Sequence, residues 1–150
     1  MIQIAQYLAP ERVVDLRSRT KDAALMEIVQ TLRSSHEVKD VETVLQAVLE
    51  REKALSTGIG LGVAVPHAKI PGVPEFLLAY GRSREGIDFS SIDDRPVHHV
   101  VLIVGPQDRQ PRYLQFLASV TLTLKRSELR RDLELAAGPA DLHRILAAAK

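Results

Sequence analysis

The stretch VHHVVLIV, residues 97–104, decides the fold because it is short, rich in β-branched residues and almost wholly apolar. A run of this kind that ends at a turn signal, here Gly105-Pro106, is typical of a strand buried at the centre of a sheet. A second such run, FLLAYGRS at residues 76–83, precedes it and predicts another strand. The middle of the chain is therefore expected to form the sheet.

Helical patterns flank these two strands on both sides. Apolar residues recur at helical spacing, with Thr20 as an N-cap before the first helix and Gly138-Pro139 as the C-cap of one helix and the restart of the next. The predicted helices span residues 20–34, 41–53, 111–124, 127–137 and 140–149. Helices before and after a central set of strands predict an α/β fold, a three-layer sandwich whose mixed central β-sheet carries helices on both faces.

The composition narrows the classes of function. The chain has 150 residues with no linker, repeat or charge block, so residues 1–150 are expected to form a single domain. The chain has 20 Lys and Arg residues and 19 Asp and Glu residues, a net charge of +1. The whole chain therefore has no net electrostatic attraction to nucleic acid or anionic lipid. The basic residues near 125–131 alternate with acidic ones, as on a solvated helix face.

Cysteine and long apolar segments are both missing from the sequence. Without cysteine there is no disulfide, thiolate catalysis or Cys-based zinc site, which suits a reducing compartment. The first fifteen residues lack a signal-peptide pattern, and no segment approaches the roughly 20 apolar residues of a membrane span. We therefore expect a soluble cytoplasmic protein that does not insert into a membrane.

Three alternating glycines open the stretch TGIGLGVAVPHAK, residues 57–69. No Lys-Ser or Lys-Thr pair follows them, as a P-loop requires, and no helix opens after them, as a dinucleotide site requires. The glycines instead favour a loop that turns tightly beside a short strand at residues 62–65.

His67 follows this loop directly after Pro66. The proline ring fixes one backbone dihedral and favours an extended residue before it, so the backbone that presents His67 is stiff on one side. Imidazole titrates near neutrality and can attack carbon or phosphorus as a nucleophile. From the residues alone two interpretations stay open: a nucleophilic histidine, and a histidine at a strand end that bonds to the backbone.

Metal and hydrolase chemistry have weaker support. There is no HExxH pair, and the adjacent His98 and His99 are expected to point to opposite faces of a strand, so neither a metal nor another cofactor is predicted. Serines are present, but no GxSxG nucleophile elbow accompanies them.

Two segments carry a resemblance to a known family. REKALSTGIGLGVAVPHAK at residues 51–69 and EGIDFSSIDDRPVHHVVLIVGP at 85–106 closely resemble the fructose/mannitol-type enzyme IIA domains of the bacterial phosphotransferase system, especially the stand-alone nitrogen-regulatory IIA proteins. The likeness extends to the flanking helices and to the total length. It implies a phosphohistidine intermediate in a relay rather than a free-standing enzyme.

The resemblance also assigns roles to residues. His67 would accept a phosphoryl group from the histidine-containing phosphocarrier protein, Arg51 would clamp the transferring oxygens, and the Thr57 hydroxyl would donate to them. Gly58 and Gly60 would lie beside the phosphoryl site. In transporting members the group then passes to a IIB domain, and in nitrogen-regulatory members the phosphorylation state governs binding to other proteins. Arg51 could instead be a solvated residue at a helix end that offsets its acidic neighbours.

One position departs from the family pattern. The family commonly carries a second histidine where this chain has Tyr113, which can donate one hydrogen bond and stack on imidazole but cannot become a cation near neutral pH. Leu61 likewise stands where close relatives often have a polar residue. These departures favour a regulatory protein over a sugar-transport component. They also leave an alternative open: a non-phosphorylated binding module of the same fold that docks proteins without phosphoryl transfer.

Overall fold

Six strands form one mixed sheet in the computed structural model of the chain, which describes residues 2–149. The strands are β1 (Leu8–Asp15), β2 (Gly58–Gly60), β3 (Val63–Ala64), β4 (His67–Ile70), β5 (Leu77–Ile87) and β6 (Val97–Pro106). Their order is β1-β5-β6-β3-β2, and β4 also pairs with β6. Strands β3 and β4 run parallel to β6 one after the other, whereas β5 pairs with it antiparallel. Strand β6 is therefore central, as its composition predicts.

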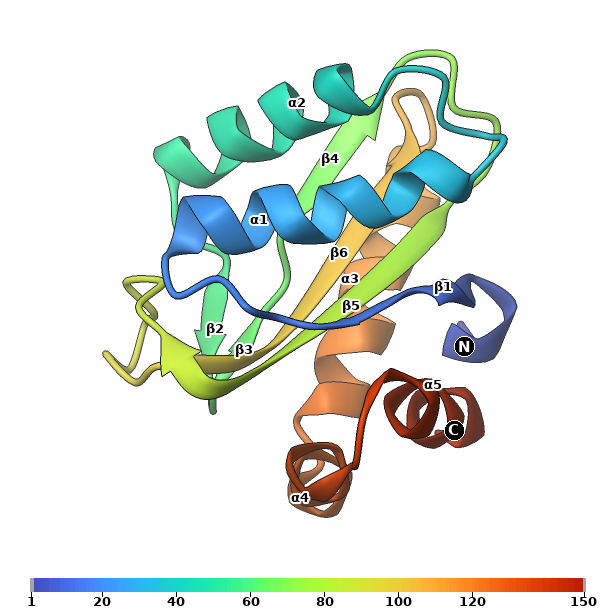
Figure 1. Ribbon diagram of the computed structural model, residues 1–150. Coiled ribbons are helices and arrows are strands. Elements are labelled where there is room, and N and C mark those ends of the chain that lie inside the picture. The colour runs from blue at the N-terminus through green and yellow to red at the C-terminus, as the bar shows by residue number, and fades with distance from the viewer. Residues whose placement is uncertain (1, 150) are drawn as a thin grey trace.

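Helices cover both faces of this sheet, which confirms the predicted three-layer α/β sandwich. The helices are η1 (Ile4–Gln6), α1 (Lys21–Gln30), η2 (Thr31–Ser34), α2 (Val41–Ala54), α3 (Gln110–Leu124), α4 (Ser127–Leu135) and α5 (Pro139–Ala148). Figure 1 shows α1 and α2 on one side of the sheet and α3, α4 and α5 on the other. The predicted N-cap of α1 forms, because the Thr20 side chain accepts a hydrogen bond from Ala23 N. The Asp40 side chain likewise accepts from two amides at the start of α2.

Two hydrophobic cores explain why β6 is apolar at successive positions. Val100, Leu102 and Val104 belong to the core under α1 and α2. Val101 and Ile103 belong to the core under α3, α4 and α5. Because side chains alternate across a strand, a strand covered on both faces needs apolar residues at both sets of positions.

Several short or irregular elements differ from the sequence-based expectation. Strand β1 contains a proline and a buried arginine and shifts its register on β5, so its apolar residues do not alternate. Strands β2, β3 and β4 have only three, two and four residues, too few to show a period. Gly138 was expected to cap α4, but α4 ends with Ala136 as its C-cap, and Gly138, at φ −174°, is the N-cap of α5.

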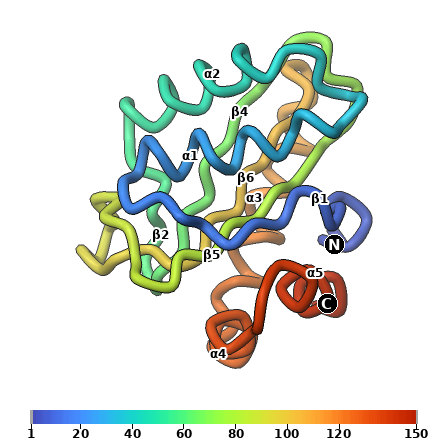
Figure 2. The backbone as a smooth tube through the Cα atoms, in the orientation of Figure 1, coloured from blue at the N-terminus to red at the C-terminus, as the bar shows by residue number. Residues whose placement is uncertain are grey.

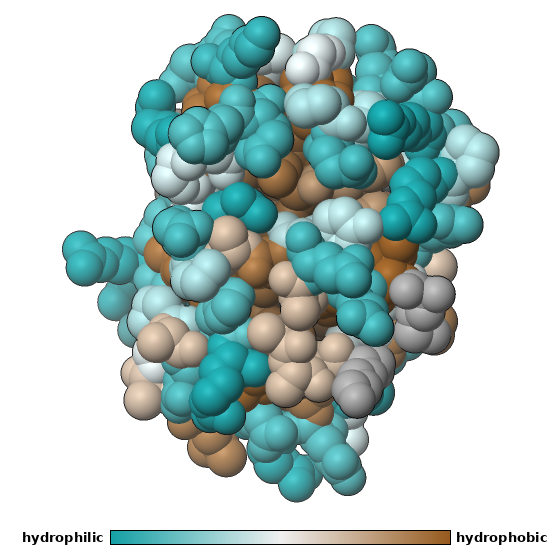
Figure 3. All heavy atoms as spheres, turned by 90° about the vertical axis from the view of Figure 1, so that its right-hand side faces the viewer, coloured by the Kyte–Doolittle hydropathy of each residue, from teal (hydrophilic) through white to brown (hydrophobic). Residues whose placement is uncertain are grey.

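The two ends of the described chain lie side by side. Figure 2 shows η1 next to α5, and the two are in contact. The His143 Nε2 atom of α5 donates to the Leu8 carbonyl oxygen of β1 at 3.0 Å. The face that contains these ends is covered mostly by hydrophilic side chains, with smaller hydrophobic areas between them (Figure 3). None of the helices within residues 2–149 combines the length and the apolar character needed to span a membrane.

Candidate functional site

His67 is the first residue of β4, immediately after a break in the sheet. Strand β3 ends at Ala64, and the two residues between the strands, Val65 and Pro66, keep individual bonds: the Val65 amide donates to the Thr57 carbonyl, and the Pro66 carbonyl accepts from the Ile103 amide, both at 3.0 Å. The Val65 carbonyl lies outside the strand ladder. It accepts from Nδ1 of His67 at 3.0 Å.

The hydrogen bonds of His67 fix its tautomer. A carbonyl oxygen can only accept, so Nδ1 carries the proton. The Nε–H group of Arg51 donates to Nε2 at 3.2 Å, so Nε2 holds the lone pair. Burial lowers the pKa of His67 below its ordinary value of 6.5, and the charges of Arg51 and Lys69 lower it further. At neutral pH the half-buried ring is therefore uncharged, and its lone pair lies on Nε2.

Arg51 lies in the last turn of α2 and is anchored at two points. Besides the contact with His67, its Nη1 donates to the Leu55 carbonyl at 2.9 Å, which also satisfies a carbonyl just beyond the helix end. Its acidic neighbours have other partners, since Glu50 pairs with Lys53 at 3.6 Å and Glu52 with Lys21 at 2.7 Å. Arg51 is thus a residue of the His67 site and does not offset the charges next to it in the sequence.

Thr57 bonds to Glu52 in this structure, so its hydroxyl proton is already used, and its expected bond to the phosphoryl oxygens stays a prediction. Its Oγ1 donates to Glu52 Oε1 at 2.6 Å, and its amide donates to Glu52 Oε2 at 2.8 Å. Both side chains are buried, and Lys21 neutralises the carboxylate. The hydroxyl proton of Thr57 is therefore used within the protein, where it ties the glycine loop to α2.

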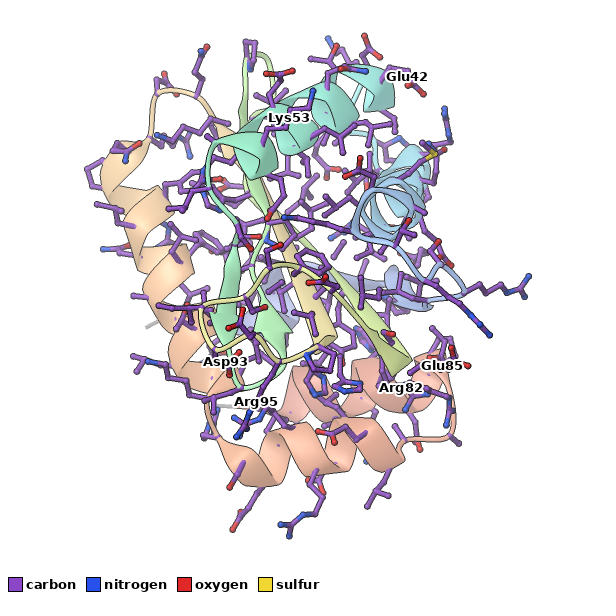
Figure 4. The ribbon with its side chains drawn as sticks, turned by 90° about the vertical axis from the view of Figure 1, so that its left-hand side faces the viewer. Glu42, Lys53, Arg82, Glu85, Asp93 and Arg95 are labelled. Carbon is purple, nitrogen blue, oxygen red and sulfur yellow. The ribbon has the colours of Figure 1, made fainter. Side chains whose placement is uncertain are left out.

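The glycines shape this loop rather than present free amides. A Cβ atom on Gly58 would lie 2.2 Å from the Oγ atom of Ser91, and the Gly58 amide donates to the Ser56 hydroxyl. Gly60 has φ +93°, in the region that favours glycine, and Leu61 follows at φ +60°. Asp93, in the loop beside β2 (Figure 4), accepts from the Leu61 amide at 2.9 Å. These contacts and dihedrals agree with the conformational interpretation of the glycines, and the place of Gly58 and Gly60 beside a phosphoryl site stays a prediction.

Tyr113, in the first turn of α3, packs its ring against His67. The two ring centroids lie 5.5 Å apart at an interplanar angle of 69°, an edge-to-face contact. Tyr113 is 1% exposed, and its hydroxyl has no hydrogen-bond partner among the described residues. Burial raises the pKa of the phenol, although the charge of Arg51 opposes this shift. The phenol is therefore protonated at neutral pH.

Lys69 is a further residue of the site that the sequence reasoning missed. It lies two residues after His67 on β4, so both side chains leave the same face of the strand. Its Nζ lies 5.4 Å from the Tyr113 ring centroid and donates to the Gln110 side chain at the start of α3. The signal was the spacing of two residues, which has meaning only once His67 is known to begin a strand.

The other strand histidines belong to separate networks. His98 Nδ1 donates to the Ser83 carbonyl at 2.8 Å, whereas His99 contacts the Tyr80 hydroxyl at 2.8 Å and Glu134 at 3.3 Å. Within residues 2–149, no three His, Asp or Glu side chains gather into a group that could hold a metal ion.

The chain is similar to known proteins over nearly its whole length. Residues 7–149 match the family model described as "Phosphoenolpyruvate-dependent sugar phosphotransferase system, EIIA 2". The chain is 34% identical over 133 residues to the fructose-specific EIIABC component of Bacillus subtilis, covering 88% of this chain but only 21% of that protein. It is 33% identical to the fructose-specific EIIA component of Haloferax volcanii, covering 85% of this chain and 83% of the relative.

A solved structure is also close to this one. The nitrogen regulatory protein IIA-Ntr from Neisseria meningitidis superposes with a TM-score of 0.86 and 26% identity, covering 95% of this chain and 98% of that one. At this identity and coverage, the whole architecture is shared from β1 to α5.

Proposed function

This chain belongs to the EIIA 2 family of the phosphoenolpyruvate-dependent sugar phosphotransferase system, and from that premise we propose that it carries a phosphoryl group on Nε2 of His67. One observation carries the proposal. The same imidazole is tautomerically fixed by the Val65 carbonyl on one nitrogen and faces the guanidinium of Arg51 on the other. This arrangement provides both a lone pair for attack and a cation for the arriving phosphate.

The transfer step needs no further covalent chemistry. The Nε2 lone pair attacks phosphorus, the N–P bond to the donor histidine breaks, and the donor imidazole leaves with that electron pair. The Nδ1 proton stays on His67 throughout. Its bond to the Val65 carbonyl stabilises the positive charge that develops on the ring.

Arg51 changes partner during this step. In the structure its Nε–H group donates to the same lone pair that must attack phosphorus. When a phosphoryl group arrives, the guanidinium is displaced from Nε2, and the oxygens of the incoming group offer better acceptors for its N–H groups. The anchor on the Leu55 carbonyl keeps the guanidinium within reach of those oxygens.

The proposed donor is the histidine-containing phosphocarrier protein, in the cytoplasm. The proposed next partner is either a IIB domain, which accepts the phosphoryl group, or a target protein whose binding depends on the phosphorylation state of His67. Similarity to IIA-Ntr over nearly the whole chain supports the regulation of a target protein, and Tyr113 in place of a second imidazole supports it further.

A reconstituted relay tests the proposal. With phosphoenolpyruvate, enzyme I and the phosphocarrier protein, the chain should gain one acid-labile phosphate, and His67→Ala should gain none. Labelling that persists in His67→Ala would place the chemistry elsewhere. A chain that stays unlabelled but retains a partner in a pull-down would instead be a docking module of the same fold.

A further inference from the structure

The Tyr113 hydroxyl is a buried donor without an acceptor. Ser91 Oγ and Tyr113 Oη are the buried side-chain polar atoms of residues 2–149 that have no partner, and only Tyr113 contacts His67. An unsatisfied buried hydroxyl is costly, and phenylalanine would fill the same space without that cost. The hydroxyl is therefore a poor choice for packing alone.

The ring that carries this hydroxyl packs against the reactive imidazole. The Tyr113 and His67 ring centroids lie 5.5 Å apart in an edge-to-face contact. Arg51 lies 3.2 Å from Nε2 of His67 through its own Nε atom. The tyrosine ring and the guanidinium thus both contact the same imidazole.

Lys69 is a second cation close to Tyr113 and His67. The Lys69 ammonium is held beside the Tyr113 ring, 5.4 Å from its centroid, and its bond to Gln110 ties it to the start of α3. Lys69 and Arg51 therefore bring positive charge to the site from two elements, β4 and α2.

We propose that the Tyr113 hydroxyl is a ligand of the phosphoryl group on His67, donating to one of its oxygens while Lys69 supplies a second positive charge beside Arg51. This inference rests on the function proposed above. The phenol keeps its proton, and no bond beyond the N–P bond forms or breaks. Because the hydroxyl finds its acceptor only in the phosphorylated protein, it favours that state over the unphosphorylated one.

The matched test compares two tyrosine-to-phenylalanine variants. Tyr113→Phe keeps the ring and removes the unpartnered hydroxyl. Tyr80→Phe removes a buried hydroxyl that already has a partner in His99. For each variant we would measure the equilibrium constant for phosphoryl exchange with the phosphocarrier, the lifetime of the phosphohistidine, and the thermal midpoint with and without phosphate.

The two variants should behave in opposite ways. Tyr113→Phe should leave the unphosphorylated midpoint unchanged or raised, yet shift the exchange equilibrium against the phosphorylated form by about tenfold, as expected for a lost bond to a charged acceptor. Tyr80→Phe should lower both midpoints and leave the exchange equilibrium unchanged. Lys69→Met should weaken phosphorylation in the same direction as Tyr113→Phe.

The outcomes separate this inference from the function on which it rests. If wild type is labelled on His67 and Tyr113→Phe matches it within twofold in both equilibrium and lifetime, the inference is wrong while the phosphoryl-carrier function stands. If wild type takes no label from the phosphocarrier, both fail.

Discussion

Removing the charge of Arg51 should slow phosphoryl acceptance far more than removing any neighbouring charge. A unit charge about 4 Å from a phosphoryl oxygen is worth about 4 kcal/mol at an effective dielectric constant of about 20. Arg51 is half-buried, so solvent and salt screen part of this interaction. Taking half the value gives about 2 kcal/mol, or about 30-fold in rate for Arg51→Ala.

The assay is single-turnover transfer from the phosphorylated phosphocarrier, followed by quenched flow. Arg51→Lys should recover only part of the loss, because an ammonium keeps the charge but loses the planar fork that reaches both the Leu55 carbonyl and Nε2. Lys53→Ala is the matched control: it removes a charge from the same last turn of α2, but from a side chain that is 75% exposed and paired with Glu50 (Figure 4).

The result that would refute this reasoning is clear. If Arg51→Ala transfers within threefold of wild type at low salt, the guanidinium does not face the phosphoryl group. If Lys53→Ala slows transfer as much as Arg51→Ala, the effect belongs to the general charge of the surface and not to the geometry of the site.

Three further predictions concern the residues around this site. Because burial lowers the pKa of His67, the ring should titrate below 6.5 in an NMR titration. The neutral ring therefore contributes to the free energy of unfolding fully above pH 6.5, and this contribution is lost as the pH falls through the folded-state pKa. The His67→Gln variant should not show this loss. Glu52→Ala leaves two donors of Thr57 without an acceptor and the charge of Lys21 without its counter-ion, so urea denaturation should show a loss of about 3 kcal/mol, whereas the exposed Glu50→Ala should change stability little. Gly58→Ala places a methyl group against a buried serine and should cost about 1–3 kcal/mol in the same assay.

The sequence predicted the long, regular elements because their patterns extend over enough residues to show a period. Strand β6 and all five α-helices have continuous apolar faces, and each lies where its pattern placed it within a few residues. Strands β2, β3 and β4 are held by pairing with partners distant in the chain, which no local pattern records. Strand β1 was not predicted for a different reason. Its Arg12 is buried through bonds to the backbone and to Ser35, so the segment lacks the alternating apolar pattern of a strand.

The site divides in the same way. The proximity of His67 and Arg51 was implied by a specific family motif, and their 3.2 Å contact needed only the end of α2 to meet the start of β4. The bonds of Thr57 to Glu52 were not predicted, because Glu52 stands in the charged run at residues 50–53, which is typical of a solvated helix end. That carboxylate is buried, and its three donors, two from Thr57 and one from Lys21, meet it only in three dimensions.

The junction at Val65 and Pro66 connects the fold to the chemistry of the site. Strands β3 and β4 both pair with β6, one before and one after this junction. Proline has no N–H to contribute, so pairing is interrupted at the junction, while its own carbonyl still anchors the chain to Ile103. The Val65 carbonyl does not join the ladder and accepts a hydrogen bond from Nδ1 of His67, which leaves the lone pair on Nε2, facing Arg51. This one carbonyl thus selects the nitrogen of the histidine that is proposed as the nucleophile.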